Sequence, residues 1–163
     1  MKTRSATQVL FETDYYQWTQ GTVKHLQNRD VENLDWEHLI EEVELLGISA
    51  KNTVKGSLEV LLVHLLYYQY WYNRREYLTE GWADEIEEFR SQFEKSLASR
   101  SLYNYMLTIL DQTYAKAKRR AVRRFVRAKL IPPQFPDQCP YSIAQLFDEN
   151  YFPEFKSELE SSD

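Results

Sequence analysis

The segment from Leu34 to Gly47, LDWEHLIEEVELLG, combines apolar and acidic residues at helical spacing. Apolar residues at 36, 39, 40, 43, 46 and 47 follow helical spacing, and carboxylates stand at 35, 37, 41, 42 and 44. Because residues three and four apart share one face of an α-helix, the pattern predicts an amphipathic helix. One face of that helix is expected to pack against the rest of the protein.

The same periodicity recurs along the chain, whereas the alternating pattern of strands is missing. Only 4 Gly and 5 Pro interrupt the sequence, and all five prolines follow residue 131. We predict an all-α fold, a compact bundle of about five helices with a short C-terminal helix and an irregular tail. The predicted helices cover roughly 14–28, 35–47, 50–72, 82–98 and 99–129, followed by a short helix after Pro140.

Capping residues and helix breakers place the ends of these helices. Thr13 and Asp35 are the expected N-caps of the first and second helices, since their side chains can accept free backbone N–H groups. Asp30 and Asn33 predict the turn between them. Gly47 is expected to end the second helix, so that the third helix returns antiparallel to it.

Length and composition are those of a single domain. A chain of 163 residues with 43% hydrophobic residues can build one core, so we predict one domain over 1–163 with flexible ends at 1–12 and 154–163. The lone cysteine, Cys139, cannot form an intrachain disulfide, and no apolar leader is present, which predicts a cytoplasmic protein. The longest apolar run, 60–72, is too short to cross a membrane.

Four blocks of sequence resemble one bacterial protein family known only as domain of unknown function number twenty-nine. They are YYQW at 15–18, LDWEHLIEEVELLG at 34–47, HLLYYQYW at 64–71 and FPDQCPYSIAQLFDENYFP at 135–153. The resemblance implies a compact helical bundle and no established activity, and it assigns no functional residue. The chain departs from the family pattern at His38, where the family has Asn, and in the more basic segment 116–129.

A row of glutamates on the second predicted helix is a candidate metal site. Glu37, Glu41 and Glu44 share one flank, and an antiparallel third helix would bring His64 towards them. Carboxylates with one imidazole suit a hard metal ion. However, the Glu-x-x-His pattern of di-iron bundles is not met, because Leu61 stands three residues before His64. A solvated acidic edge with a core histidine explains the same residues.

A basic segment on the fifth predicted helix is a candidate anion-binding site. No acidic residue occurs from 112 to 134, and eight Lys or Arg occur within 116–129. Helical spacing gathers five of them on one side, and we call these five the basic ridge: Lys116, Arg120, Arg123, Arg124 and Arg127. The ridge can neutralise nucleic-acid phosphates. Alternatively, it pairs with acidic residues of the preceding helix, namely Asp84, Glu87 or Glu88.

Signals of catalysis are weak. Cys139 precedes Pro140 at the start of the last predicted helix, where a thiol can become more acidic, but no general base stands near it in the sequence. Phosphate loops and the common zinc and redox motifs are absent. The sequence therefore predicts no catalytic residue and no cofactor.

We predict a cytoplasmic helical-bundle protein that binds another macromolecule or itself rather than catalysing a reaction. Clustered aromatic residues at 67–72 suit a protein interface, since Tyr and Trp are enriched there. One alternative is a nucleic-acid-associated protein that uses the basic ridge. A second alternative is a metal-dependent hydrolase that uses Glu41, Glu44 and His64.

Overall fold

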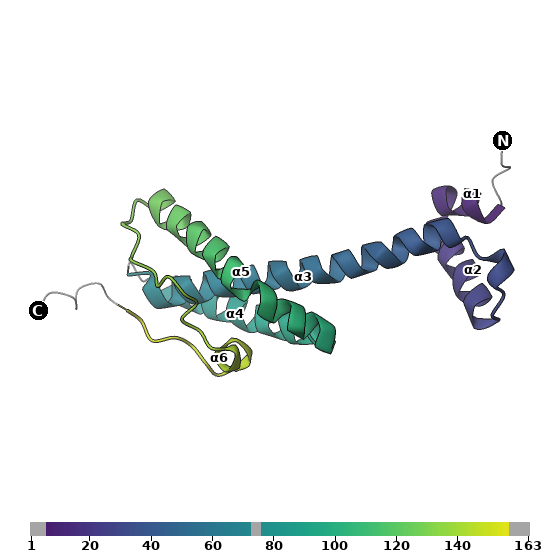
Figure 1. Ribbon diagram of the computed structural model, residues 1–163. Helices are drawn as coiled ribbons and strands as arrows, with labels where there is room; N and C mark the ends of the chain where they lie inside the picture. Colours follow the sequence, from purple (N-terminus) through teal and green to yellow (C-terminus); the bar gives the residue numbers. More distant parts are fainter. Residues whose placement is uncertain (1–5, 73–75, 157–163) are drawn as a thin grey trace, which may run out of the picture. The chain divides into compact units, whose positions relative to one another are not determined.

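The computed structural model describes residues 6–72 and 76–156, in which every regular element is a helix (Figure 1). The all-α prediction is confirmed. The elements are α1 (Ala6–Thr13), α2 (Tyr15–Gln27), the 3-10 helix η1 (Val31–Asn33), α3 (Trp36–Tyr70), α4 (Glu76–Ser96), α5 (Arg100–Arg127) and α6 (Ile143–Phe147).

The chain forms two compact units, unit 1 at 1–49 and unit 2 at 50–163, and their boundary falls inside α3. Unit 1 holds α1, α2, η1 and the first part of α3. One helix, α3, contributes to both units. The single domain therefore stays a prediction.

The first predicted helix, 14–28, is present as α2, and Asp14 separates it from α1, a helix that the sequence patterns did not predict. Asp14 is the N-cap of α2, where its side-chain oxygen accepts a hydrogen bond of 2.9 Å from the backbone N–H of Gln17. Thr13 was expected in this role, but its hydroxyl donates to the carbonyl oxygen of Val9 within α1. Residues 6–12, predicted to be flexible, belong to α1.

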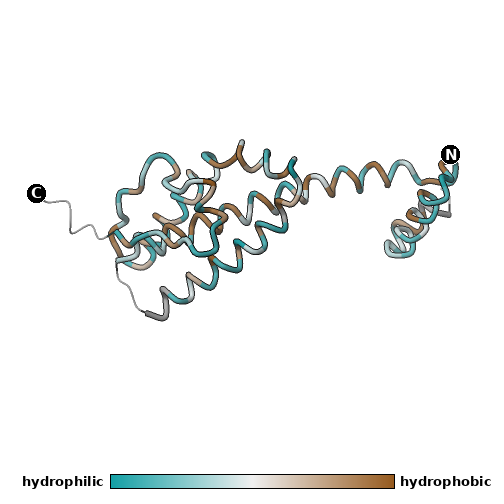
Figure 2. The backbone as a smooth tube through the Cα atoms, turned by 90° about the horizontal axis from the view of Figure 1, so that it is seen from below, coloured by the Kyte–Doolittle hydropathy of each residue, from teal (hydrophilic) through white to brown (hydrophobic). Residues whose placement is uncertain are grey.

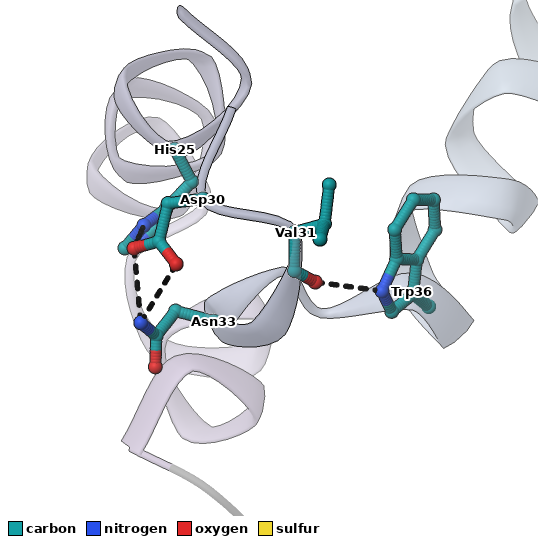
Figure 3. Close-up of polar contacts among 5 residues, drawn as sticks. All are labelled: His25, Asp30, Val31, Asn33 and Trp36. Atoms are coloured by element: carbon teal, nitrogen blue, oxygen red, sulfur yellow. Dashed lines mark hydrogen bonds and ion pairs between the residues drawn. The ribbon is translucent and has the colours of Figure 1, made fainter. Parts of the chain in front are cut away.

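The predicted turn at Asp30 and Asn33 is present and contains η1 (Figure 3). The Asn33 amide donates to both carboxylate oxygens of Asp30, at 3.0 and 2.9 Å, and His25 Nδ1 lies 2.9 Å from the same carboxylate. These contacts lower the pKa of Asp30, the Asn33 bond most strongly. The indole N–H of Trp36 donates to the carbonyl oxygen of Val31 and ties the turn to the start of α3.

The carboxylate of Asp35 does not cap α3 as predicted. It is buried and lies 3.2 Å from the indole nitrogen of Trp18 and 2.6 Å from Nδ1 of His38, on whose ring Phe11 stacks. These side-chain donors take the place of the backbone N–H groups. Asp35 therefore holds α2 to α3 within unit 1.

The helix break predicted at Gly47 is wrong, because α3 runs without interruption from Trp36 to Tyr70. No glycine among the described residues has the positive φ of a helix C-cap. A glycine inside a helix costs about 1 kcal/mol relative to alanine, which is less than the loss of several backbone hydrogen bonds. The antiparallel return after Gly47 is therefore absent.

The core of unit 2 forms where the later part of α3 packs with α4 and α5. Trp71 contacts both partners, with its ring centroid 5.4 Å from that of Trp82 and 4.5 Å from that of Phe125. In Figure 2 hydrophobic and hydrophilic stretches alternate along these helices, as expected of amphipathic helices. Fully buried residues include Val54, Leu58, Leu61, Leu65, Ile86, Phe93, Met106, Ala117, Ala121 and Phe125. No described helix has both the length and the apolar character needed to span a membrane.

The segment after α5 packs back on unit 2 through buried hydrogen bonds. The Tyr141 hydroxyl donates to the side-chain oxygen of Gln69 at 2.9 Å. The guanidinium of Arg90 on α4 donates to the carbonyl oxygens of Gln145 and Leu146 in α6. The short helix predicted after Pro140 is confirmed as α6, and Ser142 is its N-cap with a complete capping box.

Candidate functional site

A polar cavity of about 520 Å³ lies in unit 2 and opens along the basic ridge. Its wall from α5 consists of four ridge residues, which alternate with buried residues along the helix. The other walls come from α3 and α4. We call this cavity the arginine pocket, and its lining residues are His64, Tyr67, Trp82, Glu85, Arg120, Arg123, Arg124 and Arg127.

Helical spacing explains why the arginines share one wall. Ala117 and Ala121 are fully buried and fix the opposite side of α5 in the core. Arg123, Arg124 and Arg127 remain exposed and have no ion-pair partner among the side chains that the structure describes. These three arginines are the open part of the basic ridge.

The other part of the ridge is paired with a buried acidic residue, Glu59 of α3. Lys116 Nζ lies 2.6 Å from Glu59 Oε2, and Arg120 Nη1 lies 3.6 Å from Glu59 Oε1. The pairing predicted with α4 is wrong, because in the part of the chain that the structure describes no ion pair joins the ridge to Asp84, Glu87 or Glu88. Sequence reasoning missed Glu59, although a single carboxylate within an apolar run is a usable signal.

His64 and Glu85 are in close polar contact in the lining of the pocket. His64 Nε2 lies 2.5 Å from Glu85 Oε2, and its Nδ1 lies 2.8 Å from the carbonyl oxygen of Val60. Burial lowers the pKa of His64 and Arg120 acts in the same direction, against the opposing effects of Val60 and Glu85. Glu85 itself is half exposed and is the pocket's acidic lining residue.

Two aromatic side chains complete the pocket. The rings of Tyr67 and Trp82 lie 5.7 Å apart. Burial raises the pKa of Tyr67, whereas Arg120, Arg124 and Arg127 act in the opposite direction because their charges stabilise a phenolate. The positive potential of the arginine side chains therefore extends across the pocket to α3.

The residues of the metal hypothesis are not brought together as expected. Glu41, Glu44 and His64 all belong to α3, and the carboxylate that meets His64 comes from Glu85. Glu41 and Glu44 are exposed. Across the described ranges, no three His, Cys, Asp or Glu residues are grouped so that they could hold a metal ion.

Cys139 is a half-buried thiol rather than a helix cap. Its Sγ lies 3.7 Å from the carbonyl oxygen of Tyr141, and Ser142 takes the capping position at α6. Burial raises the pKa of Cys139, opposite to the acidification that a helix N-terminus would produce.

A second, apolar cavity of about 490 Å³ lies along α5 and shares Arg123 with the arginine pocket. Arg119 lines it together with Lys118, and the Lys118 ammonium donates to the carbonyl oxygen of Pro136. Arg119 is exposed and does not line the arginine pocket, so it provides a matched comparison for the pocket arginines.

The predicted apolar stripe of the 34–47 segment is exposed in unit 1 rather than buried. Exposed fractions reach 59% at Val43 and 68% at Leu46. We call this surface the unit 1 apolar face, which consists of Trp36, Ile40, Val43 and Leu46. Such a face is a feature of protein interaction surfaces.

Comparison with known proteins identifies the family but no activity. No curated protein and no solved structure matches this chain. One family model matches residues 10–152. This range contains the first three sequence blocks in full and the fourth up to Phe152. The chain therefore belongs to the family described as domain of unknown function DUF29.

Proposed function

We propose that this protein is a non-catalytic binding protein of the bacterial cytoplasm, and that it binds a nucleic acid through the arginine pocket. The observation that carries the proposal is the group of three exposed arginines without ion-pair partners, Arg123, Arg124 and Arg127, beside a polar cavity of about 520 Å³. The absence of ion-pair partners applies to the described part of the chain.

The chemistry of the lining favours a phosphate-bearing partner. Arginine offers paired N–H groups that match phosphate oxygens, and such charge-assisted hydrogen bonds are about twice as strong as neutral ones. Trp82 and Tyr67 place aromatic rings beside these donors, and bases of single strands stack on such rings. The net charge of −5 opposes nonspecific binding of an anion elsewhere on the surface.

Retention of short single-stranded RNA and DNA tests the proposal. We expect binding at about 50 mM salt that weakens as salt rises, because cations are released from the phosphates. Arg123→Glu combined with Arg124→Glu should abolish retention, and Arg119→Glu on the same helix should retain it. If the unmutated protein retains neither nucleic acid at this salt concentration, the proposal is wrong.

A second candidate function is association with a protein, either a second copy of this chain or another partner. It is favoured by the unit 1 apolar face, on which Val43 and Leu46 are exposed. Light scattering should show a mass that increases with protein concentration, and Val43→Lys with Leu46→Lys should remove the increase. A mass that stays that of a monomer at all concentrations would exclude self-association and leave only a different protein as the partner of this face.

A further inference from the structure

We propose that the arginine pocket binds a nucleotide unit that carries a phosphomonoester, either the phosphorylated end of a strand or a free mononucleotide, in preference to an internal phosphodiester. The inference rests on the proposed function, because both place the phosphate at the same arginines. It adds which kind of phosphate the pocket selects.

The shape of the pocket is the first argument. Three helices supply its lining, with His64 from α3, Trp82 from α4 and Arg124 from α5 on different walls. Its volume of about 520 Å³ lies within the range of pockets that enclose small ligands. A strand end or a single nucleotide can enter such a cavity, whereas an internal phosphate has chain on both sides that must also be accommodated.

The density of positive charge is the second argument. Four arginines line the pocket within the two helical turns from Arg120 to Arg127. Two carboxylates oppose them, Glu85 in the lining and Glu59 beside Arg120. An internal phosphodiester offers one negative charge and two unesterified oxygens. A phosphomonoester carries a charge of about −1.5 to −2 and offers three such oxygens, so it satisfies more of the guanidinium donors.

The remaining lining residues suit the rest of a nucleotide. Glu85 is half exposed at the pocket edge, and its carboxylate can accept a hydrogen bond from a ribose hydroxyl. The ring of Trp82 lies 5.7 Å from that of Tyr67, which gives the pocket an aromatic side for a base. The three kinds of group in a nucleotide thus each have a chemical counterpart in one cavity.

The test compares strands of one sequence that differ only at their ends. Fluorescence polarisation measures binding of a short single strand with a 5′-phosphate, with a 3′-phosphate, or with hydroxyl groups at both ends, and AMP and adenosine serve as competitors. We expect at least one phosphorylated strand to bind on the order of tenfold tighter than the hydroxyl strand, because charged hydrogen bonds are gained. AMP should compete, and adenosine should not.

Variants assign the preference to the pocket. Arg124→Gln should remove most of the difference between phosphorylated and hydroxyl strands, whereas Arg119→Gln should leave it unchanged. Thermal melting followed by circular dichroism shows whether each variant is folded, and Arg127→Gln is the second pocket variant if Arg124→Gln is not. A preference that persists in both pocket variants overturns the assignment.

The outcomes separate the two proposals. Equal affinity for phosphorylated and hydroxyl strands overturns the phosphomonoester preference and leaves nucleic-acid binding in place. Binding of AMP without binding of any strand supports the preference for a phosphomonoester and removes the nucleic-acid partner. Binding of neither strands nor AMP overturns both.

Discussion

His64 lies between two oxygen atoms, with Nε2 2.5 Å from Glu85 Oε2 and Nδ1 2.8 Å from the carbonyl oxygen of Val60. Both oxygen atoms are acceptors, so His64 can donate a hydrogen bond to each of them only when both of its ring nitrogens carry a proton. Burial of the ring opposes the second proton and lowers the pKa of His64. The protonation of His64 therefore determines whether the pocket holds one more positive charge beside its arginines.

Anion affinity should consequently rise as pH falls. At about pH 7.5 His64 is neutral, since its pKa lies below the usual value of about 6.5 in the free protein. Protonation adds a positive charge that attracts an anion, so the affinity for a strand with hydroxyl ends should increase down to about pH 5.5. Polarisation titrations across this range measure it. In His64→Gln the added pH dependence should be absent; an unchanged profile would show that another group is responsible.

Glu59→Gln should strengthen anion binding while weakening the fold. Glu59 is 8% exposed and holds Lys116 and Arg120, both about half exposed. Removing its charge frees Arg120 for a ligand and should lower the free energy of unfolding by only about 1 kcal/mol, because solvent screens the partners. Urea unfolding and anion titration measure the two effects. Glu41→Gln, at an exposed residue, is the control. A loss of anion affinity in Glu59→Gln would contradict the idea that Glu59 competes with the anion for Arg120.

Tyr141→Phe should destabilise unit 2 without altering the arginine pocket. The Tyr141 hydroxyl donates to Gln69 Oε1 at 2.9 Å, and both residues are buried. The substitution leaves the amide oxygen without this donor, at a cost of about 1–3 kcal/mol. Thermal unfolding should show a melting temperature lower by several degrees. Tyr16→Phe, at a side chain that is 74% exposed, should have little effect; equal melting of the two variants would mean that the buried bond contributes nothing net.

Gly47→Ala should stabilise the protein. Gly47 lies inside α3, its φ is not positive, and a Cβ placed there meets no atom within 4 Å. Alanine in an exposed helix interior is favoured over glycine by about 0.5–1 kcal/mol. Urea unfolding measures the change, and Gly56→Ala, which also has open space around it, provides a parallel case. Destabilisation at Gly47 alone would indicate that the helix ends there.

Local sequence patterns predicted the helical class and which residues of α5 face away from the core. The spacing of Ala117, Ala121 and Phe125 on one side and of the arginines on the other determines that orientation, and both depend only on helix geometry. The end of a helix was less predictable. Gly47 is compatible with either a C-cap or a helix interior, and the surrounding backbone hydrogen bonds decide between them.

Contacts between helices were beyond the sequence patterns. The pairing of His64 with Glu85, and of Glu59 with Arg120, joins residues far apart in the chain and depends on how α3, α4 and α5 pack. Asp35 likewise has the residue type of an N-cap, but its carboxylate contacts Trp18 and His38. Such competition between side chains appears only once the helices are placed.

If the arginine pocket binds anions as proposed, the carboxylate of Glu59 sets a threshold for the anions that occupy all of it. Because Glu59 belongs to the same chain, it stays beside Arg120 at a fixed effective concentration whatever the solution contains. We expect a small, weakly held anion to contact Arg123, Arg124 and Arg127 without displacing Glu59 from Arg120. A multivalent ligand bound at the first three arginines would be held close enough to compete with Glu59, so we expect Arg120 to respond to the valency of the ligand more than to its concentration.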